Sequence, residues 1–182
     1  MIYVFLATGF EEVEALTPVD LLRRAGHEVR LVGVGGKTIA GAHGIGVVCD
    51  LTENEIKLDG ALEMIVLPGG MPGTLNLEKS AAVQAAVDHC NANGIFIGAI
   101  CAAPSILGHK GLLDGREAIA YPGFEEQLTG ARISTHSVAQ DGFIITAQGA
   151  GAAVAFGLKL VEALDGKARA EQLAASICYP EH

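Results

Sequence analysis

Tryptophan is absent from this sequence, and aromatic residues make up only 5% of its 182 positions. A core built on large aromatic rings is therefore excluded, and the interior must rely on Val, Ile, Leu and Ala. That composition is expected of helices packed over a buried parallel sheet. Half of the residues are apolar and only 18% are charged, which disfavours an intrinsically disordered chain.

Basic residues are scarce as well: 12 Lys and Arg stand against 21 Asp and Glu, a formal net charge of -9 at pH 7. Nucleic acids and acidic membranes are polyanions, so this charge disfavours both as partners. No basic run precedes the apolar N-terminal stretch, and no segment reaches the roughly 20 apolar residues of a membrane span. We therefore expect a cytoplasmic protein, and the length predicts one domain over residues 1–182.

The four cysteines, at positions 49, 90, 101 and 178, lie far apart and form no CxxC pair. Neither a zinc site nor a disulfide framework is indicated, and reduced thiols are expected. The six histidines show no metal-ligand spacing such as HExxH, and a Walker loop is absent. The sequence therefore predicts no metal and no cofactor.

Short apolar runs alternate with amphipathic segments along the chain. Strands are predicted over residues 2–6, 29–34, 64–67, 95–100 and 143–146. Helical patterns fill most of the gaps, and this alternation is the signature of βαβ units. We therefore predict an α/β fold, a mainly parallel sheet with helices on both faces. Residues 37–50 interrupt the alternation with closely spaced glycines and predict a hairpin or edge excursion.

The helix boundaries follow from capping signals. The first predicted helix starts with Thr17 as N-cap and Pro18 in its first turn, and it ends at Gly26. Because Pro18 cannot donate a backbone hydrogen bond, residues 11–16 are predicted to be a short turn or a kinked extension. Further helices are predicted over residues 77–92, 152–164 and 167–177.

Cys101 directly follows the predicted strand 95–100 and precedes Ala102-Ala103-Pro104. This is the edge of an α/β sheet at which ligands bind. A cysteine at a strand-to-helix junction faces the positive end of the helix, which predicts a pKa well below that of a free thiol. The alternative is a small buried side chain that ends a core strand, which is common for free cysteine.

Glu14 and the glycines at 69 and 70 follow two other predicted strands. The apolar neighbours of Glu14 would raise its pKa if it is buried, and a protonated carboxyl can donate a hydrogen bond to a thiolate. The alternative is a solvated acid in the first turn of a helix, as we expect for Glu11 and Glu12. Gly69 and Gly70 can present backbone N–H groups to an oxyanion, or they can simply form a turn.

Several motifs, taken together, resemble those of one family. They are GFEEVEALTPVD at 9–20, LPGG at 67–70, AICAAP at 99–104 and VEAL at 161–164. They span nearly the whole chain, which is similar to members of the DJ-1/ThiJ/PfpI superfamily and most similar to the DJ-1-like branch. The resemblance implies a flavodoxin-like three-layer α/β sandwich that is usually a homodimer.

The resemblance also implies roles for individual residues. Cys101 corresponds to the reactive cysteine on a strained elbow, and Glu14 corresponds to its acidic partner. The oxyanion donors are the backbone amides of Gly70 and Ala102. Arg24 stands where the family pattern has an arginine close to the site entrance.

The chain departs from the family pattern at two positions beside the nucleophile. The protease-like branch has a histidine directly after the cysteine, whereas this chain has Ala102, which disfavours a peptidase. In the DJ-1 branch a histidine often lies beside the cysteine, and Tyr121 occupies that place in chain order. A tyrosine, with an ordinary pKa near ~10, is a poor base near neutrality but can donate a hydrogen bond. Cys49 matches a cysteine near the dimer contact of such proteins.

These residues favour a cofactor-independent glyoxalase or deglycase-type enzyme that acts on small dicarbonyls such as methylglyoxal and glyoxal, or on their early adducts. An alternative is a redox-responsive or chaperone-like stress protein that senses peroxide through oxidation of Cys101. A third interpretation is a structural dimer with a vestigial site. The predicted partners are a small carbonyl substrate and a second copy of the chain, with no nucleic acid and no membrane.

Overall fold

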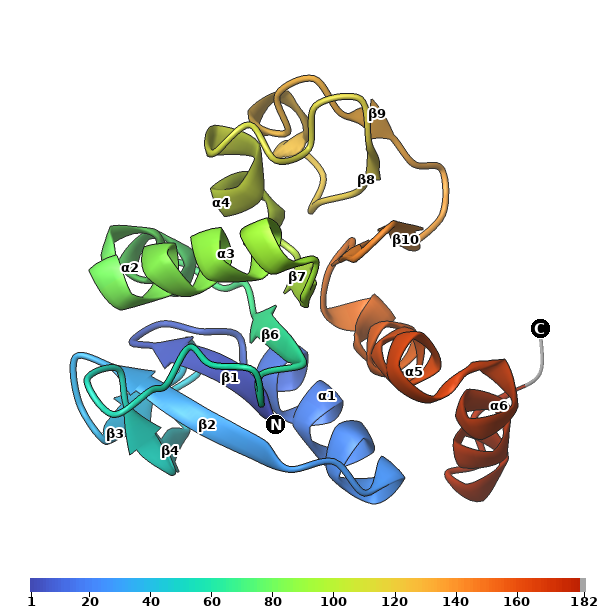
Figure 1. Cartoon of the computed structure of the whole chain (residues 1–182), viewed down its shortest axis with the longest axis horizontal. Coiled ribbons are helices and arrows are strands. Elements are labelled where there is room, and N and C mark those ends of the chain that lie inside the picture. The colour runs from blue at the N-terminus through green and yellow to red at the C-terminus, as the bar shows by residue number, and fades with distance from the viewer. Residues whose placement is uncertain (181–182) are drawn as a thin grey trace.

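The computed structural model describes residues 1–180, which form a seven-stranded sheet between two layers of helices (Figure 1). The strand order is β10-β11-β7-β6-β1-β2-β5, and all neighbouring pairs are parallel except β10 with β11. In that order the strands are Val138–Asp141, Ile144–Ala147, Phe96–Ile100, Met64–Leu67, Ile2–Ala7, Val29–Val34 and Leu51–Thr52. The predicted mainly parallel α/β fold is confirmed.

Each face of the sheet carries its own apolar core. Along β1, Ile2, Val4 and Leu6 pack into one cluster, whereas Tyr3 and Phe5 pack into the other, because successive strand residues point to opposite faces. The first cluster is covered by α1 (Glu12–Ala25), α5 (Ala153–Asp165) and α6 (Lys167–Ser176). The second is covered by α2 (Gly73–Lys79), α3 (Ala81–Asn93) and α4 (Pro104–His109).

The glycine-rich interruption forms the predicted hairpin, β3 (Thr38–Ala40) paired antiparallel with β4 (Gly46–Val48). Its end is tied to the loop between β1 and α1, because the N–H of Gly9 donates to the Ala40 carbonyl at 2.9 Å and the N–H of Ala42 to the Phe10 carbonyl at 2.8 Å. The hairpin therefore lies beside the start of α1. A short parallel pair that the sequence did not indicate joins β8 (Glu117–Ala118) to β9 (Arg132–Ile133).

The predicted start of the first helix is wrong. Helix α1 begins at Glu12, so Thr17 is not its N-cap and Pro18 lies inside the helix. The physical reason is the buried stripe of Ala15, Pro18, Val19 and Leu22, whose helical spacing continues through the proline. Burial of this stripe outweighs the backbone hydrogen bond that Pro18 cannot make. The helix ends at left-handed Gly26, as predicted.

The predicted single helix over 77–92 is two helices. Ser80 separates α2 from α3, and its hydroxyl accepts a hydrogen bond from the Val83 N–H at 3.4 Å. Serine is a preferred N-cap, so the break follows from local chemistry. The expected core-facing stripe of α3 is confirmed, and α5 and α6 lie within one residue of their predicted bounds.

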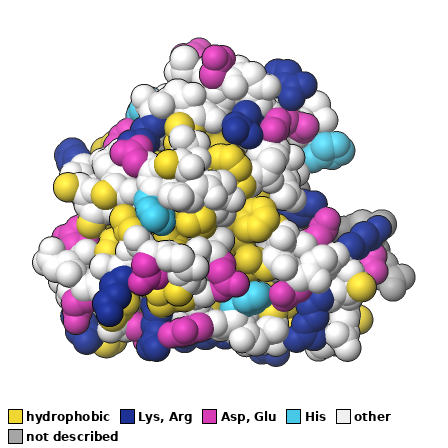
Figure 2. All heavy atoms as spheres, viewed as in Figure 1, with side chains coloured by type: hydrophobic (Ala, Val, Ile, Leu, Met, Phe, Trp, Pro, Cys, Tyr) yellow, Lys and Arg dark blue, Asp and Glu magenta, His cyan; other side chains and the backbone are white. Residues whose placement is uncertain are grey.

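Two short 3-10 turns, Glu125–Gln127 and Ala150–Ala152, complete the regular structure of the described residues. Acidic and basic side chains are interspersed over the face shown in Figure 2. Within residues 1–180, no helix has both the length and the apolar character needed to cross a bilayer.

Gly33 in β2 tests how tightly the hairpin segment packs on the sheet. A Cβ at Gly33 would lie 2.0 Å from the Gly36 carbonyl oxygen and 3.2 Å from the Cys49 sulfur, whereas a Cβ at Gly36 would meet open space. We expect Gly33→Ala to lower the free energy of unfolding by about 1–3 kcal/mol, since the clash is with backbone. Gly36→Ala should change it by less than about 1 kcal/mol. Urea unfolding measures the free energy of unfolding of both variants. Equal unfolding midpoints for the two would contradict the close packing of the hairpin segment against Gly33.

Candidate functional site

Cys101 sits on a strained turn at the carboxyl end of β7. Its φ is +65°, a left-handed conformation that costs a residue with a Cβ about 1–2 kcal/mol. Two hydrogen bonds hold it there: the N–H of Cys101 donates to the Ala147 carbonyl, and the N–H of Tyr121 donates to the Cys101 carbonyl, both at 2.9 Å. The elbow expected from the sequence is therefore present.

Glu14 reaches the same point from the first turn of α1. Its side chain is 1% exposed, its carboxylate accepts the Gly69 N–H at 3.0 Å, and it hydrogen-bonds the Cys101 sulfur. A Cβ at Gly69 would lie 2.6 Å from both the Cys101 Cβ and a Glu14 carboxylate oxygen. Glycine at position 69 is thus what allows the acid and the thiol to meet.

Burial raises the pKa of Glu14 to about 7. The hydrogen bonds from Cys101, Gly69 and Ala150 act in the opposite direction, and the nearby charge of Glu11 adds to the increase. A carboxyl with this pKa is partly protonated at neutral pH. It can therefore both accept and donate a proton beside the sulfur.

The pKa of Cys101 is raised to about 12, because the sulfur is buried and the Glu14 carboxylate lies beside it. Backbone N–H groups of Gly70 and Ala102 donate to the sulfur and lower its pKa, but they do not outweigh these two effects. The lowered pKa expected from the sequence is therefore wrong, and burial of the sulfur is the main physical reason. When Glu14 is protonated its repulsive charge is absent, so the two groups titrate as a linked pair.

The two auxiliary residues lie in different places. Tyr121 is beside the site: its backbone holds the elbow, and its ring, 51% exposed, lies 3.2 Å from the position of a Cβ built on Gly149. Arg24 lies ten residues beyond Glu14 on α1, about 15 Å along the helix at 1.5 Å per residue, and it pairs with Asp20 at 2.7 Å. Within one chain, the structure does not bring Arg24 to Cys101.

Glu12 is not the solvated acid expected from the sequence, because its side chain is 5% exposed. Burial alone would raise its pKa, but hydrogen bonds from His43 and Ile45 lower the pKa to about 2. The His43 Nδ1 lies 2.9 Å from Glu12 and 3.5 Å from Glu11, and its pKa is raised mainly by the hydrogen bond to Glu12. Gly41 leaves room for the Glu12 side chain, because a Cβ at position 41 would lie 2.2 Å from Glu12. This glycine is the feature of the sequence that could have indicated the burial of Glu12.

The donor atoms of Glu11, Glu12 and His43 lie within 4.8 Å of one another, a spacing that a metal ion could bridge. The sequence predicted no metal site. One carboxylate oxygen of Glu12 already accepts the N–H groups of His43 and Ile45, at 2.9 and 3.4 Å, and the other faces the His43 ring. The position of these three side chains is therefore explained by hydrogen bonds that attach the hairpin to α1, without a metal ion.

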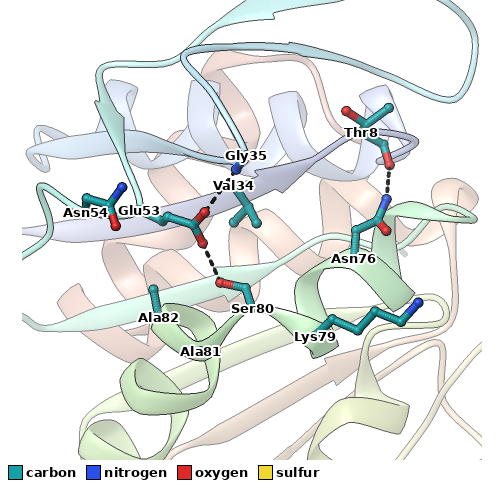
Figure 3. A pocket seen from close by; sticks show the side chains of 10 residues that line it. All are labelled: Thr8, Val34, Gly35, Glu53, Asn54, Asn76, Lys79, Ser80, Ala81 and Ala82. Atoms are coloured by element: carbon teal, nitrogen blue, oxygen red, sulfur yellow. Dashed lines mark hydrogen bonds between the residues drawn. The ribbon is translucent and has the colours of Figure 1, made fainter.

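A polar cavity of about 630 Å³ lies at the carboxyl ends of β1 and β2 (Figure 3). Three of its polar side chains, those of Glu53, Asn76 and Ser80, bind one another or the adjacent backbone. The Glu53 carboxylate accepts the Ser80 hydroxyl at 2.6 Å and the Gly35 N–H at 3.1 Å, and the Asn76 amide donates to the Thr8 carbonyl at 2.9 Å. Neither Cys101 nor Glu14 lines this cavity.

A model of the DJ-1/PfpI family matches residues 1–163 of this sequence. The chain belongs to the DJ-1/PfpI family. It is 33% identical over 174 residues to protein dj-1beta of Drosophila melanogaster, covering 94% of this chain and 92% of that one. It is 29% identical over 170 residues to the glutathione-independent glyoxalase DJR-1.2 of Caenorhabditis elegans, covering 92% and 90%.

Among solved structures, oxidised DJ-1 from Toxoplasma gondii superimposes with a TM-score of 0.91 at 35% sequence identity, covering 99% of this chain and 98% of that one. The family membership and the α/β sandwich inferred from the sequence are thereby confirmed. The homodimer implied by the resemblance stays a prediction. Three of the exposed large apolar side chains, Val13, Ile45 and Val48, lie on α1 and around β4.

The buried carboxyl of Glu14 predicts a specific dependence of stability on pH. Between its ordinary pKa of 4.5 and its folded pKa of about 7, the folded protein holds a proton that the unfolded chain has released. The contribution of Glu14 to the free energy of unfolding is therefore fully present below pH 4.5. It is lost as the pH rises to 7, by about 1.4 kcal/mol per pH unit. Glu14→Gln cannot titrate, so this part of the slope should disappear.

Urea unfolding of both proteins at intervals from pH 5 to pH 8 measures the slope. Relative to the wild type, the variant should gain stability steadily up to about pH 7 and then hold that gain. A constant difference between the two proteins over the whole range would show that Glu14 has the same pKa in the folded and unfolded states.

Proposed function

We propose that this protein is a cysteine-dependent glyoxalase or deglycase-type enzyme that acts on small reactive dicarbonyls or their early adducts. The observation that carries the proposal is the contact of Cys101 with a buried carboxyl whose pKa is close to neutral. A relative named as a glutathione-independent glyoxalase supports the same chemistry. The residues that act are Cys101 and Glu14, with backbone N–H groups of Gly70 and Ala102 as oxyanion donors.

In the first step, with methylglyoxal as substrate, the Cys101 sulfur forms a bond to the aldehyde carbon. Ionised Glu14 accepts the thiol proton as the bond forms. The reaction therefore does not require a free thiolate beforehand, despite the high pKa of Cys101. The electron pair of the C=O bond moves to the aldehyde oxygen, where the N–H groups of Gly70 and Ala102 stabilise the charge. Glu14 then gives the thiol proton to that oxygen, which forms a hemithioacetal and leaves Glu14 ionised again.

In the second step, Glu14 removes the proton from the carbon bonded to sulfur. The electrons move onto the neighbouring ketone and give an enediolate. The hydroxyl proton of the former aldehyde oxygen passes to the former ketone oxygen, and Glu14 returns its own proton to the former ketone carbon. The product is a thioester of lactate, so one carbon is oxidised and its neighbour is reduced with no external oxidant. Water then hydrolyses the thioester, which releases lactate and restores the thiol.

Formation of lactate from methylglyoxal without glutathione tests this mechanism. Cys101→Ser should reduce the rate to background, and Glu14→Gln should lower kcat by about 10²–10⁴-fold because the proton transfers lose their base. Cys178→Ser, which changes an exposed cysteine, is the matched control and should retain the wild-type rate. Equal rates for the wild type and Cys101→Ser would refute the assignment.

A second candidate function is peroxide sensing through Cys101. The observation in its favour is that the donors around the sulfur, Gly70, Ala102 and a protonated Glu14, would also hold the oxygens of a sulfinic acid. The similarity to a DJ-1 solved in an oxidised form supports it. The raised pKa of Cys101 acts against it, because peroxide attacks the thiolate.

Mass spectrometry after mild peroxide treatment separates the two functions. Sensing predicts a gain of two oxygens at Cys101 before any at exposed Cys178, together with negligible turnover of dicarbonyls. Oxidation of Cys178 first, or turnover without selective oxidation of Cys101, would leave only the enzymatic function.

A further inference from the structure

A second cavity, of about 720 Å³, is lined in part by the backbone segments that hydrogen-bond Cys101 and Glu14, although neither of these two residues lines it. Its wall is formed by the glycine-rich turn after β11, residues 148–152, together with the 121–122 segment, α5 and the segment after α6. The side chains that shape it are those of Tyr121, Gln148, Ala152, Ala155 and Tyr179. It is separate from the polar cavity of Figure 3, which lies beside α2 and α3.

The cavity and the reactive pair share parts of one wall. Ala150, which lines the cavity, donates its backbone N–H to the Glu14 carboxylate. A Cβ at Gly149 would lie 3.2 Å from the Tyr121 ring and 4.0 Å from a Glu14 carboxylate oxygen. Tyr121 in turn donates its backbone N–H to the Cys101 carbonyl. A group attached to a carbonyl at Cys101 therefore has this cavity next to it.

The chemistry of the lining selects the kind of group. None of the described residues that line it carries a formal charge: two tyrosine rings, Pro122 and several Ala and Gly positions form the lining together with the polar side chains of Ser137 and Gln148. Aromatic rings pack well against such surfaces. A carboxylate placed there would meet no cationic side chain among the described lining residues, and the net charge of -9 adds to its repulsion.

We infer that this cavity is the subsite for the second substituent of the dicarbonyl substrate, and that it accepts uncharged aromatic groups in preference to anionic ones. The inference rests on the proposed function and extends it to the substrate class. The methyl group of methylglyoxal would fill a small part of the cavity. A phenyl ring in its place would gain contact with Tyr121 and Tyr179 while the aldehyde stays at Cys101.

Initial rates with methylglyoxal, phenylglyoxal and 4-carboxyphenylglyoxal test the subsite. For the wild type, we expect kcat/KM to be at least tenfold higher for phenylglyoxal than for the carboxylated compound. Ala155→Phe should lower the ratio of kcat/KM for phenylglyoxal to that for methylglyoxal at least tenfold, because the new ring occupies the cavity. Ala168→Phe, on the exposed side of α6, is the matched control and should leave this ratio unchanged.

Ala155→Lys provides a second variant that does not depend on filling the cavity. A cation in the lining should raise the preference for 4-carboxyphenylglyoxal over phenylglyoxal at least fivefold. If both Ala155 variants turn over methylglyoxal with wild-type ratios for all three substrates, the subsite is refuted and the proposed function stands. If the wild type turns over none of the three compounds, the proposed function fails, and the subsite fails with it.

Discussion

The contact between the Glu14 carboxyl and the Cys101 sulfur, made across Gly69, is the constraint on which this site depends. The two side chains come from elements that only the parallel sheet brings together, since α1 follows β1 and Cys101 ends β7. β6 lies between those two strands, and the turn that follows it carries Gly69. Because any Cβ at position 69 would overlap both partners, that position in the turn after β6 must be glycine for the pair to form.

A buried acid next to a buried thiol creates a problem of charge, which the backbone partly solves. With both groups ionised, two negative charges would lie in a site with little water, so the second ionisation is strongly opposed. With a pKa of about 7 for Glu14 and about 12 for Cys101, the single charge resides on Glu14 at rest, and it reaches Cys101 only when the thiol proton is transferred. N–H groups of Gly69 and Ala150 stabilise it on Glu14, and those of Gly70 and Ala102 stabilise it on Cys101. The pair is thus suited to moving one proton over a short distance.

Local patterns predicted β1, β2, β6, β7 and β11 because these strands are predominantly apolar runs. They did not predict β5, which has two residues, or β10, which ends in Gln140 and Asp141. They failed where burial overrides a local preference. Pro18 is typical of a helix start, yet burial of the apolar stripe around it keeps the chain helical on both sides of the proline. Glu12 reads as a solvated acid, yet the hairpin covers it and supplies its hydrogen bonds. The pKa of Cys101 failed for a related reason, since the charge of a neighbour distant in sequence decides it.

The backbone and the side chain of Tyr121 have different structural roles. Its N–H holds the Cys101 carbonyl and so supports the elbow whatever the side chain is. Its ring, half exposed, is left to form the wall of the adjoining cavity. Replacing the histidine expected in the DJ-1 branch by tyrosine therefore preserves the geometry of the nucleophile while it changes the surface that the substrate meets. Under the proposed function, proton transfer is the role of Glu14, and the inferred subsite provides the selectivity.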